Sequence, residues 1–77
     1  MKINWKILRQ IRERKQKENK IEDYSAEKVA YLLGYYSVQV YKNLESWNQK
    51  WMVEKKWQKL KVLLKLTEEE IDLLTSV

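Results

Sequence analysis

The chain has 77 residues, in which 16 Lys and Arg outnumber 11 Asp and Glu and give a formal net charge of +5. It contains no cysteine and no histidine, which excludes disulfides, the usual zinc sites, thiol nucleophiles and histidine-dependent catalysis. One glycine and no proline are too few turn residues for an all-β chain, and no apolar run is long enough to span a membrane. We therefore expect one basic, helical, cytoplasmic domain over residues 1–77, with no metal and no cofactor.

The basic residues fall into two blocks. Residues 1–20 carry eight basic and two acidic side chains, and residues 42–66 carry seven basic and two acidic ones. Residues 21–41 have a net charge of −2, and residues 67–77 have a net charge of −4. Two basic segments around a nearly neutral centre suit a polyanion that is held at two places, although a solvated basic surface is the alternative interpretation.

The first predicted helix covers residues 2–15, with Asn4 as a possible N-cap. Its apolar stripe consists of Ile7, Leu8 and Ile11, which Trp5 extends by one turn. Residues 16–23 carry one apolar side chain, so they form either a frayed extension of this helix or a polar loop. Asn19 is the residue expected to end the helix in a left-handed conformation.

A second helix is predicted over residues 25–33 and a third over residues 37–45. Ser25 and Ser37 precede them, and a serine hydroxyl caps a helix well. Gly34, the one glycine of the chain, comes directly after the second helix, where a left-handed residue has little steric cost. About three residues remain between the two helices, which is enough only for a sharp corner.

The last two predicted helices cover residues 53–64 and 68–75, and residues 46–52 before them have no helical stripe. The apolar positions of the fourth helix that we assign to the core are Trp57, Leu60 and Leu64. Thr67 precedes the fifth helix, and Glu70 follows three residues later in capping-box spacing.

The stretch SAEKVAYLLGYYSVQVYKNLE, residues 25–45, has the pattern of a helix-turn-helix. Ala30 is small where the next helix crosses, and Gly34 lets the chain turn. Tyr41 and Leu44 hold the third helix on the core. The N-terminal face of the third helix is then left for the major groove of DNA.

The whole chain resembles the Cro/repressor (XRE-like) helix-turn-helix family of phage repressors and bacterial regulators. The matching segments are LRQIRERK (8–15), YSAEKVAYLLG (24–34), SVQVYKNLES (37–46) and WQKLKVLLKLTEEEIDLL (57–74). The resemblance implies an all-α, five-helix Cro/repressor-like bundle that binds duplex DNA as a homodimer. It also implies that the acidic fifth helix faces away from DNA, where it is free for dimerisation.

The chain departs from the family pattern at several positions. The connection between the first two helices is longer than in typical members. Trp47 and Lys65 stand where the family usually has glycine, so Lys65 is expected in a left-handed conformation at a cost of about 1 kcal/mol. Ala26 replaces a polar residue that touches a phosphate, which leaves the backbone amides of the helix N-terminus for that contact.

Carried over residue by residue, the resemblance places base contacts at Ser37, Val38, Gln39 and Lys42. Gln39 would pair with adenine, Lys42 with guanine, and Val38 would touch a thymine methyl group. It places phosphate contacts at Ser25, Ala26, Tyr36, Asn43, Lys50 and Arg12. It also implies that Arg12 pairs with Glu45, which would lock the first helix to the third.

The aromatic residues leave two interpretations open. Trp5 is expected in the core, with Tyr35 as a second core residue at the corner. Trp47 and Trp51 are either partly buried or exposed to a partner, and we expect at least one of them to be buried.

The sequence thus predicts a sequence-specific, double-stranded DNA-binding transcriptional regulator of the repressor type, nucleoid-associated and of host, phage or mobile-element origin. The alternative is a protein-binding module on the same fold, such as an antirepressor, antitoxin or phage-encoded inhibitor, that uses the Trp and Tyr surface. An enzyme is not expected, because no nucleophile–base pair is present, and neither is a small-molecule substrate.

Overall fold

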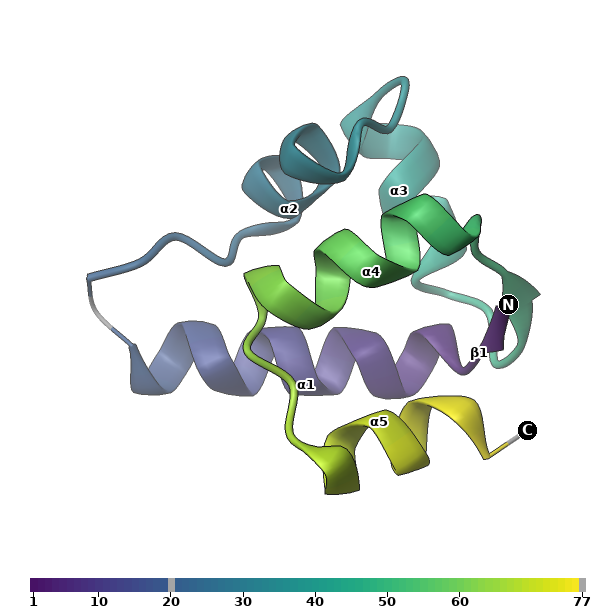
Figure 1. Cartoon of the computed structure of the whole chain (residues 1–77). Coiled ribbons are helices and arrows are strands. Elements are labelled where there is room, and N and C mark those ends of the chain that lie inside the picture. The colour runs from purple at the N-terminus through teal and green to yellow at the C-terminus, as the bar shows by residue number, and fades with distance from the viewer. Residues whose placement is uncertain (20, 77) are drawn as a thin grey trace.

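The computed structural model describes residues 1–19 and 21–76 (Figure 1). Five helices and a two-stranded antiparallel sheet lie in these ranges. The elements in chain order are β1 (Lys2–Ile3), α1 (Trp5–Glu18), α2 (Ala26–Leu33), α3 (Val38–Leu44), β2 (Lys50–Trp51), α4 (Glu54–Leu63) and α5 (Glu68–Thr75). Of the helices described, none is long and apolar enough to cross a membrane.

The expectation of an all-α chain is wrong at the N-terminus, where the first helix starts later than residue 2. Residues 2 and 3 form β1, which pairs with β2 in the register Lys2↔Trp51 and Ile3↔Lys50. Asn4 then caps α1, and its side chain accepts a hydrogen bond from the Ile7 amide at 3.1 Å. The strand forms by pairing with β2, which lies nearly fifty residues further along the chain. Local periodicity does not reveal a partner at that distance, so the strand was not predicted.

Helix α1 also extends beyond the predicted residue 15, to Glu18. Exposed pairs four residues apart support its second half, with Arg9 and Glu13 at 3.2 Å and Arg14 and Glu18 at 3.9 Å. Asn19 ends the helix in an extended conformation with φ −110°, so the expected left-handed stop is wrong. The polar segment that follows is long enough to turn without one.

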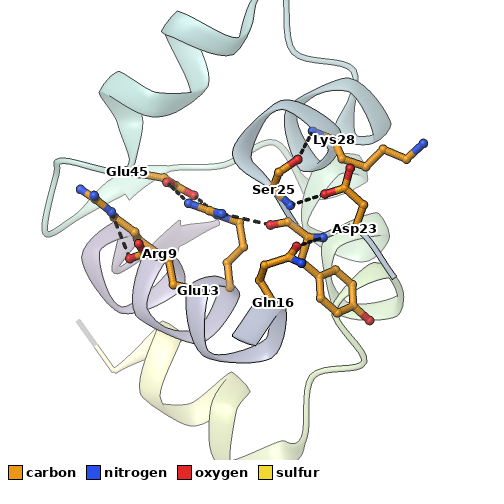
Figure 2. Close-up of polar contacts among 9 residues, drawn as sticks. Arg9, Glu13, Gln16, Asp23, Ser25, Lys28 and Glu45 are labelled. Carbon is orange, nitrogen blue, oxygen red and sulfur yellow. Dashed lines mark hydrogen bonds and ion pairs between the residues drawn. The ribbon is translucent and has the colours of Figure 1, made fainter. Parts of the chain in front are cut away.

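The corner between α2 and α3 agrees with the prediction in each local detail. The Ser25 hydroxyl accepts from the Lys28 amide at 3.3 Å (Figure 2), and the Ser37 hydroxyl accepts from the Val40 amide at 3.2 Å. Gly34 has φ +83°, in the left-handed region. The chain therefore ends one helix and begins the next within residues 34–37.

The C-terminal helices agree with the prediction as well. Lys65 has φ +51°, the left-handed conformation expected for a residue that replaces glycine. Thr67 and Glu70 form the complete capping box, with the Glu70 amide donating to the threonine hydroxyl at 3.2 Å. Helix α5 lies on the opposite side of α1 from α2 and α3 (Figure 1).

The core lies between α1, α2 and α4 and closes under α3. Trp5 and Tyr41 are fully buried, and their rings meet edge to face with centroids 5.9 Å apart. Trp57, Leu60 and Leu64 are buried as predicted. Because Tyr41 comes from α3, this aromatic contact fixes that helix against the start of α1.

Acid is expected to destabilise the fold through Glu70. Burial alone would raise the pKa of Glu70, but the Thr67 amide, Lys15 and Arg14 outweigh burial and hold this pKa below its usual 4.5. A carboxyl group with a lowered pKa in the folded state stabilises it at neutral pH, and this stabilisation is lost as pH falls through the folded-state pKa.

We therefore expect Glu70→Gln to lower the melting temperature at pH 7 and to flatten its decline below about pH 4.5. Circular dichroism melts between pH 3 and pH 7 measure this. Glu69→Gln, at the exposed neighbouring position, is the control and should keep the wild-type pH profile. Equal profiles for Glu70→Gln and wild type would refute the role of Glu70.

Candidate nucleic-acid interface

The outward face of α3 is polar. Gln39, Lys42 and Asn43 are exposed, and the Gln39 side-chain amide donates to the Asn43 side-chain oxygen, Oδ1, at 3.0 Å. Ser37 and Val38 are half-buried, and Val38 packs against the core. Val40, which the sequence analysis did not select, is 40% exposed on this helix. The sequence could have indicated Val40, because it is not one of the positions of this helix assigned to the core.

Lys42 has a partner within the molecule. Its Nζ lies 3.4 Å from Oε1 of Glu27, at the start of α2, and both side chains are about half exposed. A hydrogen bond from the backbone amide of Glu27 and the nearby Lys42 ammonium hold the pKa of Glu27 below its usual value. The two side chains therefore link the exposed face of α3 to the N-terminus of α2.

The predicted pair between Arg12 and Glu45 is confirmed. Arg12 donates from Nε to Glu45 Oε2 at 2.8 Å and from Nη2 to Oε1 at 3.0 Å, and these bonds are the dashed lines that end at Glu45 in Figure 2. Both residues are buried. A third bond runs from Nη1 to the Tyr24 carbonyl at 3.0 Å. Burial alone would lower the pKa of Arg12, but Glu45 outweighs burial and raises it. The pair joins α1 to the end of α3. Three hydrogen bonds, to Glu45 and to the Tyr24 carbonyl, occupy the buried Arg12 guanidinium that was expected at a phosphate.

Three cationic side chains border one small pocket beside this pair. The pocket measures about 210 Å³ and is lined by Arg9, Arg12, Ala26, Lys42 and Glu45. It brings α1, the N-terminus of α2 and the exposed side of α3 together. Each cation has a carboxylate partner, but the Arg9–Glu13 and Lys42–Glu27 pairs are exposed, and such pairs contribute little. Phosphate oxygens can therefore replace these carboxylates at low cost.

The other predicted contact residues lie at the start of α2, at the corner before α3 and in β2. Ser25 is half-buried at the cap of α2, with the buried Ala26 next to it. Tyr36 is 94% exposed at the corner. Lys50 is exposed in β2, with its Nζ 5.1 Å from the centre of the Trp47 ring.

The expectation that Trp47 or Trp51 is buried is wrong, since both are exposed. Trp5 lies in the core as predicted, with Tyr35 6.2 Å away, centroid to centroid. Tyr35 packs against the core but is only half-buried, less enclosed than the core position expected of it, and burial raises its pKa to about 12. The second indole of the core is that of Trp57, from α4.

The predicted structural residues hold this surface in place. Ala30, Tyr41 and Glu45 are buried, and Leu44 is partly buried against the core. The Tyr41 hydroxyl makes no hydrogen bond with the residues described, and burial, together with the nearby Glu45 carboxylate, raises its pKa. Tyr41 therefore acts in this fold through its ring.

Residues 1–19 and 21–76 contain no cluster of three acidic, His or Cys side chains that could hold a metal ion. Comparisons with protein-family models, with curated proteins and with solved structures found no match for the chain.

Proposed function

We propose that this protein is a sequence-specific, double-stranded DNA-binding transcriptional regulator of the Cro/repressor helix-turn-helix type. The observation that carries the proposal is the outward polar face of α3, presented at a tight corner beside a pocket bordered by Arg9, Arg12 and Lys42. A helix exposed in this way fits the major groove, and cations beside it neutralise the flanking phosphates.

In this proposal each part of the surface has one task. Gln39 reads adenine, and Val40 and Val38 offer methyl groups to thymine. Lys42 lies beside Glu27 at the start of α2, so we assign it to a phosphate in place of the guanine expected from the sequence. Lys42 and Arg9 exchange their exposed carboxylate partners for phosphates, and the amides at the start of α2 bind a phosphate. Arg12 orients the site by holding Glu45.

Dimerisation would let two copies of α3 read half-sites about one helical turn apart. A single small domain buries little area on DNA, so pairing is needed for useful affinity. The acidic α5 lies on the far side of α1 from α3, where DNA would not repel it (Figure 1).

Selection of bound sequences from a random duplex pool tests the proposal. We expect an enriched palindrome, with affinity that falls steeply as salt rises. Gln39→Ala should cost about 1–3 kcal/mol at one base position and leave the others unchanged. Gln58→Ala is the matched control, because Gln58 is also an exposed glutamine bonded four residues along its helix, to Glu54. No enrichment, with no salt-dependent binding, would refute the proposal.

Glu27→Gln is expected to increase DNA affinity by about threefold to tenfold at low salt. The substitution releases Lys42 and removes a negative charge beside the phosphate path, and exposed charge pairs have energies of this size. Fluorescence anisotropy with the selected duplex measures the change. Glu69→Gln makes the same change in net charge on α5 and should leave affinity nearly unchanged. Weaker binding by Glu27→Gln would contradict this account of Lys42.

A protein-binding module remains the second candidate, favoured by an apolar groove between α2 and α4. The groove is lined by Leu32, Gln58, Lys59, Val62 and Leu63, and Val62 is 78% exposed. Exposed apolar surface of this kind is typical of protein interfaces. Salt-insensitive binding of a protein partner, with no affinity for duplex DNA, would favour this candidate.

A further inference from the structure

The four tryptophans divide into two buried and two exposed. Trp5 and Trp57 are at most 2% exposed, whereas Trp47 is 52% and Trp51 is 71% exposed. The exposed pair belongs to the sheet and the loop that leads into it. Trp51 lies opposite Lys2 across the two strands, on one face of the sheet. Lys50, its neighbour in the strand, is in register with Ile3 and projects from the other face, with its Nζ 5.1 Å from the centre of the Trp47 ring. We call Lys2, Trp47, Lys50 and Trp51 the ribbon patch.

The ribbon patch adjoins the proposed DNA surface. The Trp47 carbonyl accepts from the Lys6 amide at 3.0 Å, which places the loop at the first turn of α1. One groove is lined by Lys6, Arg9, Gln10, Glu13, Glu45 and Ser46, and Arg9 also borders the pocket beside α3. Glu13 pairs with Arg9 and Glu45 with Arg12, so Lys6 is the cation of this groove that links the outer face of α3 to the sheet.

The ribbon patch is held firmly by the core beneath it. The indole N–H of Trp5 donates to the Lys50 carbonyl at 3.1 Å, and the Met52 amide donates to the Met1 carbonyl at 2.7 Å. Ile3 and Met52 are at most 1% exposed. Because this backbone is already ordered, binding through the exposed indoles loses little conformational entropy.

The local charge favours nucleic acid over a second copy of the chain. Residues 1–8 carry Lys2 and Lys6 and no acidic side chain, and residues 46–53 carry Lys50 and no acid. Two such surfaces repel each other, whereas phosphates attract them. Aromatic rings among lysines suit nucleic acid, because indoles stack on its sugars and bases while the cations neutralise its backbone.

We infer that the ribbon patch is a second contact with the duplex, outside the base pairs that α3 reads. Trp47 and Trp51 lie against the deoxyribose backbone in this arrangement, and Lys2 and Lys50 neutralise the adjoining phosphates. This inference rests on the proposed function and extends the footprint of each copy along the DNA.

Trp51→Ala is therefore expected to lower affinity for the selected duplex about five- to twentyfold, and Trp51→Phe to restore most of it. Wild-type emission should become less accessible to iodide when DNA binds, through its two exposed indoles. The double variant Lys2→Gln, Lys50→Gln should reduce the slope of log affinity against log salt by about 2. Lys55→Gln, Lys59→Gln on α4 is its charge-matched control and should keep the wild-type slope.

The possible results of these experiments separate the ribbon contact from the proposed function. Salt-dependent DNA binding with unchanged iodide quenching and full Trp51→Ala affinity would overturn the ribbon contact and leave the proposed function standing. Loss of self-association by Trp51→Ala in sedimentation, with unchanged affinity per copy, would also overturn it, in favour of a dimer contact. No DNA binding by the wild type would overturn both. Melting curves of every variant identify any that is unfolded, and for such a variant the wild-type quenching result decides.

Discussion

Glu45→Ala is expected to lower the free energy of unfolding by about 3–5 kcal/mol. The change leaves the Arg12 guanidinium buried, with one of its two partners gone and two donors unpaired. An uncompensated buried charge costs far more than the net stabilisation of the intact pair. Urea unfolding followed by circular dichroism measures the loss, which for a domain this small removes much of its stability.

Two comparisons separate the buried charge from other effects of Glu45→Ala. Glu13→Ala breaks the exposed pair with Arg9 and should cost less than about 1 kcal/mol. Replacing both partners, Arg12→Met with Glu45→Leu, should recover most of the lost stability, because no unpaired charge remains. A cost below about 1 kcal/mol for Glu45→Ala would contradict the description of this pair as buried and mutually dependent.

Trp5→Ala is expected to cost about 3–5 kcal/mol. The indole is fully buried, packs edge-on against Tyr35 and Tyr41, and bonds the Lys50 carbonyl. Alanine leaves a cavity in the centre of the core and removes the link between the core and β2. Urea unfolding gives the magnitude, and hydrogen exchange at the Met52 amide reports whether the sheet loosens with it.

Trp5→Phe separates the contribution of the indole hydrogen bond from that of the ring contacts. Phenylalanine keeps most of the ring contacts but leaves the Lys50 carbonyl without its indole partner, so about 1–3 kcal/mol should be lost. Trp51→Ala is the exposed control and should change stability by less than about 0.5 kcal/mol. Equal costs for Trp5→Ala and Trp51→Ala would contradict the division into core and surface indoles.

The sequence by itself determined the N-caps of three helices and the left-handed end of α2. Ser25, Ser37 and Thr67 each cap a helix through a bond that spans three residues. Gly34 turns left-handed directly after α2. These features depend on side-chain chemistry and backbone sterics within one turn, so residue order alone is enough to predict them.

The resemblance to a known family added the pair between Arg12 and Glu45, thirty-three residues apart. No local pattern indicates such a pair. The same resemblance did not indicate that Lys42 pairs with Glu27, because both are exposed side chains with several possible neighbours. Of these two side-chain pairs, the buried one was therefore predicted and the exposed one was not.

Only the tertiary structure decided the conformation of residues 2–3 and which tryptophans are buried. Residues 2–3 form a strand because β2 returns beside them, and Trp47 and Trp51 are both exposed although at least one of them was expected to be buried. Residues 46–52 have no helical stripe, so periodicity cannot place these two indoles. The choice depends on which ring fits the volume between distant helices, and that volume exists only once the chain has folded.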